Sequence, residues 1–191
     1  MTSSTEEKIN LPKIYTILLA YPIVLLLIGF LLNHFLFKIT PYVIALPSEE
    51  HISAFVIATV LLTINHTWIM TATEIVRAKF KIHSTPEEWE RSGCIEDQVL
   101  VEGVKELKRC HDTHLNTTEN SVYFGLLAIP FIFVSPPTLV TFIWLVGYGV
   151  ARLGYTYSFL YGKDGARGLF MSLGLLAIYG MASYLAVCLL K

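Results

Sequence analysis

The sequence is poor in charge, since only 15% of its 191 residues are charged while 54% are hydrophobic. Its 14 basic and 15 acidic residues leave a net charge of −1, so the positive field that nucleic-acid binding requires is missing and no nucleic-acid partner is expected. The three cysteines, Cys94, Cys110 and Cys188, lack the close spacings of a disulfide framework or a zinc site. Low-complexity segments and internal repeats are also missing. This composition is typical of a membrane protein.

Long apolar runs account for most of the chain. A spanning helix needs about 20 mostly apolar residues, and the first run is 24 residues long after a polar tail, residues 1–13, which is too long for a cleaved signal peptide. We therefore predict a retained helix there. Including one helix with a mixed polar and apolar sequence, five membrane-crossing helices are expected, at 14–37, 52–76, from about Val99 to just before Ser135, 138–161 and 168–190.

The third of these helices has an apolar part too short to cross a bilayer alone. Residues 122–134 are 13 in number, or about 20 Å of helix at 1.5 Å per residue. The helix must therefore carry some of Asp112, Asn116 and Glu119 to membrane depth, where a charge costs about 2.5–3.5 kcal/mol even on the lenient scale. We expect these side chains to face protein or a wet pocket, which makes them candidate site residues.

The placement of lysine and arginine predicts the orientation. Of the 14 basic residues, 11 lie in the N-terminal tail, the segment 77–110 and the turn 162–167, two lie on the opposite side, and Arg152 lies within a span. The positive-inside rule then places the N-terminus and the polar loop 77–98 in the cytosol.

Arg152 is the most unusual residue of the spans, because it is the fifteenth residue of the 24-residue run 138–161. An arginine at that depth needs a carboxylate or carbonyl oxygens as partners, and we expect Glu119 to be the carboxylate. Arg77 and Arg167 mark the cytosolic ends of two other helices, so the three arginines predict a pocket for a small anion. The alternatives left open are that Arg77 and Arg167 only anchor the helices at the interface, and that Arg152 and Glu119 form a structural pair.

Two histidines also lie on the third helix. His111 and His114 have no third ligand nearby in the sequence, so we interpret them as polar helix residues and expect no metal site.

Three sequence patterns in succession resemble those of one known family. They are His114-x-Asn116-x-x-Glu119 entering a helix, Gly149-x-x-Arg152-x-x-Tyr155-Thr156 on the next helix, and Arg167 opening the last one. The segment 76–88 is similar to the end of the family's first helix and its cytosolic loop. Over residues 52–190 the chain thus resembles the MAPEG family, the membrane-associated proteins of eicosanoid and glutathione metabolism, nearest its microsomal prostaglandin E synthase and microsomal glutathione transferase type.

The resemblance implies an all-α, membrane-embedded four-helix bundle at 52–190, to which residues 14–37 add one N-terminal transmembrane helix. It further implies a homotrimer in the endoplasmic reticulum membrane that binds glutathione between subunits at the cytosolic end and acts on a lipophilic small molecule dissolved among the membrane lipids. The activity would be that of a glutathione-dependent transferase or isomerase. Arg167 would act on the thiol, and the residues implied to bind glutathione are Arg77, Asn116, Glu119, Arg152, Tyr155 and Thr156.

Two other functions remain as alternatives. Leu115, Gly168 and Met171 stand where this family has an arginine, a serine and a tyrosine, a pattern compatible with a pseudoenzyme that serves as a membrane scaffold or lipid-binding protein. A small transporter could instead use Asp112, Glu119 and Arg152 as a polar path.

Overall fold

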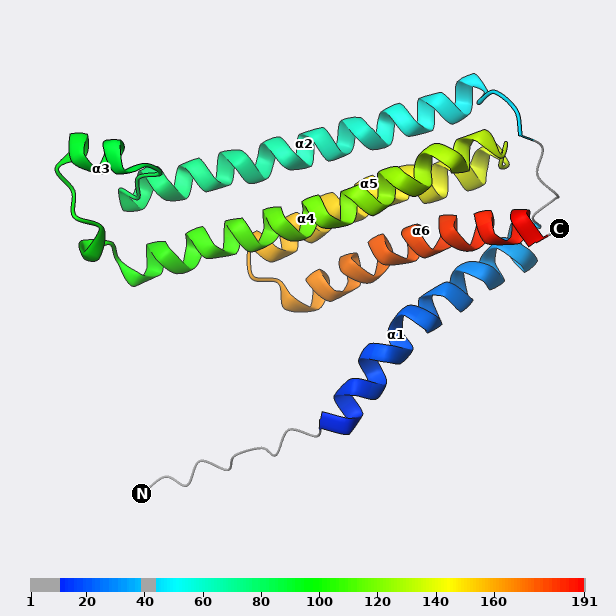
Figure 1. Ribbon diagram of the computed structural model, residues 1–191, viewed down its shortest axis with the longest axis horizontal. Helices are drawn as coiled ribbons and strands as arrows, with labels where there is room; N and C mark the ends of the chain where they lie inside the picture. Colours follow the sequence, from blue (N-terminus) through cyan, green and yellow to red (C-terminus); the bar gives the residue numbers. More distant parts are fainter. Residues whose placement is uncertain (1–10, 39–43, 191) are drawn as a thin grey trace.

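The computed structural model describes residues 11–38 and 44–190, and in these residues it is all-α, with no strand. Long helices run side by side as a bundle, with the first helix against one edge (Figure 1). The elements are α1 (Leu11–Leu31), a π-helical turn η1 (Leu32–Leu36), α2 (Glu49–Phe80), α3 (Pro86–Ser92), a 3₁₀ turn η2 (Glu96–Gln98), α4 (Val101–Phe133), α5 (Thr138–Leu160) and α6 (Asp164–Leu190).

Four of the helices are long and apolar enough to cross a membrane, namely Pro12–Leu36, Glu49–Phe80, Thr138–Leu160 and Asp164–Cys188. The chain is therefore an integral membrane protein. The 33 residues of α4 form one continuous helix that is not among them, as the short apolar run at its C-terminal end requires. At 1.5 Å per residue α2 and α4 are each about 50 Å long, more than the roughly 30 Å hydrocarbon core, so both extend beyond it and carry α3 between their ends.

The core of the bundle lies among α2, α4, α5 and α6. In it, α2 packs on α4 and α5, and α6 packs on α5 and α4. Phe124 of α4 stacks on Tyr148 of α5 with ring centres 4.2 Å apart. Gly149 lets α5 approach α2 closely, because a Cβ there would lie 3.0 Å from the Leu61 side chain. Small residues at helix contacts are typical of membrane bundles, where close packing drives association.

The N-terminal helix is fixed to the bundle by a buried polar side chain. Asn33 in η1 is fully buried and donates hydrogen bonds to the Gly180 carbonyl at 2.7 Å and to Ser183 Oγ at 2.8 Å. Its own Oδ1 accepts from the indole nitrogen of Trp144 at 3.2 Å. Helix α1 begins at Leu11, three residues earlier than expected, and residues 1–10 of the expected tail lie outside the described residues. The added helix is thus a packed part of the fold.

Replacing Asn33 with alanine is expected to lower the free energy of unfolding by about 1–3 kcal/mol, because the Trp144 N–H and the α6 acceptors lose a buried partner. The measurement is thermal unfolding of the detergent-solubilised protein. Leu36→Ala is the matched control, since Leu36 lies in the same turn but is exposed. Equal melting temperatures for the two variants would show that the Asn33 contacts do not hold α1 in place.

Candidate functional site

The centre of the candidate site is Arg152, whose side chain is only 1% exposed. Its Nη2 donates to Asn116 Oδ1 at 2.9 Å and to Thr117 Oγ1 at 2.8 Å, both on α4. On α6, Gly174 packs beside the arginine, since a Cβ there would be in ordinary contact with Arg152 Cδ at 3.8 Å. Three helices therefore enclose this guanidinium.

Arg152 has no carboxylate within ion-pair distance in the described part of the chain. The expected pairing with Glu119 is therefore wrong: Glu119 is exposed on α4, and the neutral Asn116 and Thr117 take its place. Arg152 Nε is buried without a hydrogen-bond partner. A buried charge that lacks both a counter-ion and part of its hydrogen bonds is costly, so this position favours an incoming anion.

Two aromatic rings connect Arg152 with the start of α6. The Arg152 guanidinium lies 4.4 Å from the centre of the Tyr155 ring, and the Arg167 guanidinium lies 5.1 Å from that of Phe159. The two rings are 5.7 Å apart. Cations over aromatic faces are held electrostatically. The row Arg152–Tyr155–Phe159–Arg167 therefore runs along α5 from the buried arginine to the start of α6. Phe159 was not among the predicted site residues, although it shares the helical face of Arg152 and Tyr155.

The two outer arginines are each paired with an acid three residues earlier. Arg77 Nη1 lies 2.9 Å from Glu74 Oε1, and Arg167 Nη2 lies 3.3 Å from Asp164 Oδ1. Both acids are largely exposed, and exposed ion pairs contribute about 0–1 kcal/mol. Each guanidinium can therefore exchange its present partner for a ligand carboxylate or thiolate at little cost.

The structure brings together four of the residues predicted for the site: Asn116, Arg152, Tyr155 and Arg167 are joined through the contacts above. No contact among the described residues joins the other three to this group. Arg77 contacts Glu74 near the C-terminal end of α2, Glu119 is exposed, and Thr156 is fully buried with a hydroxyl that has no hydrogen-bond partner among the described residues.

An apolar groove of about 560 Å³ adjoins this polar centre on the face between α4 and α6, and residues of both helices line it, among them Asn120, Tyr123 and Tyr179. Asn120 links the groove to the centre, because its Nδ2 donates to the Asn116 carbonyl at 2.8 Å. The groove can therefore accept an apolar molecule, and its nearest residue on α4, Asn120, lies one helical turn from Asn116.

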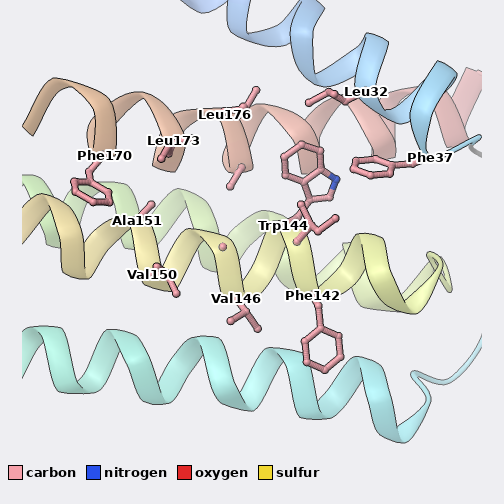
Figure 2. A pocket seen from close by; sticks show the side chains of 13 residues that line it. Leu32, Phe37, Phe142, Trp144, Val146, Val150, Ala151, Phe170, Leu173 and Leu176 are labelled. Atoms are coloured by element: carbon pink, nitrogen blue, oxygen red, sulfur yellow. The ribbon is translucent and has the colours of Figure 1, made fainter. Parts of the chain in front are cut away.

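A second groove, also of about 560 Å³, lies beside η1, α5 and α6. Figure 2 shows its wall of aliphatic and aromatic side chains, with Trp144 and Phe37 near one another and Phe170 at the other end. The indole nitrogen of Trp144 is bonded to Asn33. With no other polar side chain in its lining, this groove offers only an apolar surface.

Comparison with known proteins identifies a family. The sequence model of the MAPEG family matches residues 55–187, more than two thirds of the chain. This range includes most of α2 and α6 and all of α4 and α5, and it excludes α1. No curated protein matches the chain.

Proposed function

The chain belongs to the MAPEG family, and from this premise we propose that it is a glutathione-dependent transferase or isomerase acting on a lipophilic electrophile dissolved in the membrane. The finer likeness to the prostaglandin E synthase and glutathione transferase type remains a prediction. The single observation that carries the proposal is the buried, carboxylate-free guanidinium of Arg152.

Glutathione fits this centre because it brings carboxylates to a cation that lacks one. Arg152 Nε is free to donate, and arginine binds carboxylates with strong, charge-assisted hydrogen bonds. Asn116, already in contact with Arg152, would hold the polar backbone of the tripeptide. Tyr155 and Thr156 would line the same site, while Arg77 would take a second carboxylate at the cytosolic end.

Arg167 would act on the glutathione thiol, which supplies the nucleophile when glutathione is bound. A guanidinium next to a thiol favours the charged thiolate, and the thiolate is the reactive form. Arg167 is suited to this role because it is half-exposed and paired only with Asp164. Its contact with Phe159 places it at the end of the row that begins at Arg152.

The lipophilic partner would occupy the groove between α4 and α6. That groove is mostly apolar, and Asn120 in its lining is bonded to the Asn116 carbonyl one turn earlier on α4. An apolar electrophile could then enter from the bilayer and meet the thiolate without leaving hydrocarbon.

We further propose that the protein is a homotrimer of the endoplasmic reticulum membrane, with the N-terminus and the loop 77–98 in the cytosol. Glu119 supports an assembly, because it is exposed on α4 close to the apolar run and a carboxylate facing lipid is costly. A second copy covering this face would remove that cost and bring Glu119 to the glutathione of a neighbouring site. Native mass spectrometry of the detergent-solubilised protein is expected to give three copies.

The conjugation of glutathione to chlorodinitrobenzene tests the proposed activity. The purified protein is expected to accelerate this reaction with a rate that saturates in glutathione, because binding and thiolate formation both precede the chemical step. A folded protein that binds glutathione without accelerating the reaction would favour an isomerase over a transferase. A folded protein without measurable affinity for glutathione would contradict both.

The scaffold alternative has one observation in its favour. Asn116 and Thr117 already occupy Arg152 Nη2, so the arginine has partners without any ligand. Measuring the affinity of the folded protein for glutathione separates the two functions, because a scaffold assembles without binding glutathione.

A further inference from the structure

Two histidines on neighbouring helices meet outside the site described above. His66 lies on α2 and His114 on α4, 48 residues apart in the sequence, and His114 Nε2 is 3.3 Å from His66 Nδ1. Their ring centres are 5.2 Å apart and the ring planes are inclined by 41°. The two residues are too far apart in the sequence for their contact to be predicted from spacing. In the structure, one ring nitrogen of each histidine faces the other.

The two nitrogens lie within hydrogen-bond distance, and the same distance also suits two ligands of one metal ion. The 3.3 Å separation is near the long end of the range that N–H hydrogen bonds in proteins adopt. Two nitrogens bound to one tetrahedral zinc ion at about 2.0–2.1 Å each lie about 3.3–3.4 Å apart. The observed separation therefore matches the edge of a zinc coordination tetrahedron without any movement of the helices.

The surroundings of the pair suit a cation with bound water. Both histidines line a cavity of about 650 Å³ between α2 and α4, in which the other polar side chains are hydroxyl-bearing and none is basic. The hydroxyls of Thr59 and Thr63 donate to backbone carbonyls of α2 at 2.9 Å, so their oxygens remain available as acceptors. Water molecules on a metal ion could donate to them, and the cavity has room for several.

We propose that His66 and His114 form a binding site for a divalent transition-metal ion of the zinc type, which joins α2 to α4. Neutral imidazole is the commonest metal ligand in proteins. In residues 11–38 and 44–190 no group of three or more His, Cys, Asp or Glu could hold a metal. The ion thus has two protein ligands and completes its shell with water, and it binds more weakly than a four-ligand structural zinc. This site does not depend on the proposed glutathione chemistry.

Calorimetric titration of Zn²⁺ into the full-length, tag-free protein in detergent tests the site. One ion per chain is expected to bind, and His66→Gln or His114→Gln is expected to weaken binding by at least about tenfold, since even residues that only support a ligand cost 10–100-fold. His111→Gln is the matched control, because His111 is exposed on α4 one turn before His114 and its replacement should leave the affinity unchanged.

The zinc-loaded wild-type protein provides a second readout that needs no variant. X-ray absorption spectroscopy is expected to show a four-coordinate ion with two imidazole ligands. No Zn²⁺ binding by the wild type, binding by either glutamine variant as tight as that of the wild type, or a spectrum without two imidazoles would each overturn the proposal.

Discussion

Replacing Arg152 with glutamine is expected to weaken glutathione binding by about 30- to 3,000-fold. Truncating one partner of a buried, hydrogen-bonded charge pair costs about 2–5 kcal/mol, and each 1.4 kcal/mol is tenfold in affinity. Glutamine keeps an amide that can donate toward Asn116 or Thr117 but removes the charge that the ligand carboxylate would neutralise. The measurement is calorimetric titration of glutathione into the detergent-solubilised protein.

For the protein without ligand, the same substitution is not expected to be harmful, and the quantity concerned is the melting temperature. Because the guanidinium is buried and no carboxylate of the described residues lies within ion-pair distance of it, removing its charge removes a desolvation cost. The unliganded Arg152→Gln protein is therefore expected to melt no lower than the wild type. Arg91→Gln serves as the control, since Arg91 is exposed in α3 and should change neither quantity. Unchanged glutathione affinity in Arg152→Gln would remove Arg152 from the site.

Replacing Arg167 with alanine is expected to lower the turnover of conjugation by about a hundredfold at neutral pH, the usual loss when one electrostatic stabiliser of the reacting group is removed. The guanidinium lowers the pKa of a neighbouring thiol, so without it the thiolate forms only at higher pH. The rate of the variant is therefore expected to recover in part as the pH rises. The measurement is the pH dependence of turnover at saturating glutathione.

Two comparisons separate this catalytic role from a structural one. Arg167→Lys keeps the positive charge and is expected to retain part of the rate and most of the pH profile, whereas loss of folding would affect both variants alike. The oligomeric state should be the same in both variants and the wild type, because within the described residues the Arg167 side chain interacts with Asp164 and the Phe159 ring of its own chain. A turnover and pH profile identical to those of the wild type would exclude Arg167 from thiol activation.

The sequence predicts the helices well because each is defined by a local run of apolar residues. It also indicates that α4 brings polar groups toward the membrane, since residues 122–134 are too few to cross it. The partner of Arg152 could not be derived in this way. Glu119 and Thr117 are two residues apart on α4, so a rotation of that helix about its axis decides which of them faces α5, and this rotation depends on packing throughout the bundle.

Contacts between segments that are distant in the sequence could not be predicted either. Asn33 lies within an apolar run whose sequence indicates only a membrane helix. The α6 atoms that accept its hydrogen bonds follow about 150 residues later in the sequence. The pairing of His66 with His114 depends on α2 and α4 lying side by side in a particular register. In both cases the neighbouring sequence does not indicate the partner of the residue, and only the packing of the helices reveals it.

The most direct test of the account compares glutathione with its diethyl ester as ligands of the wild-type protein. The ester keeps the thiol and the peptide backbone but has no negative carboxylates. If a ligand carboxylate neutralises Arg152, glutathione should raise the melting temperature in a concentration-dependent way, as binding to the native state requires, and the ester should leave it unchanged. An equal rise with the ester, or no rise with glutathione, would contradict the account.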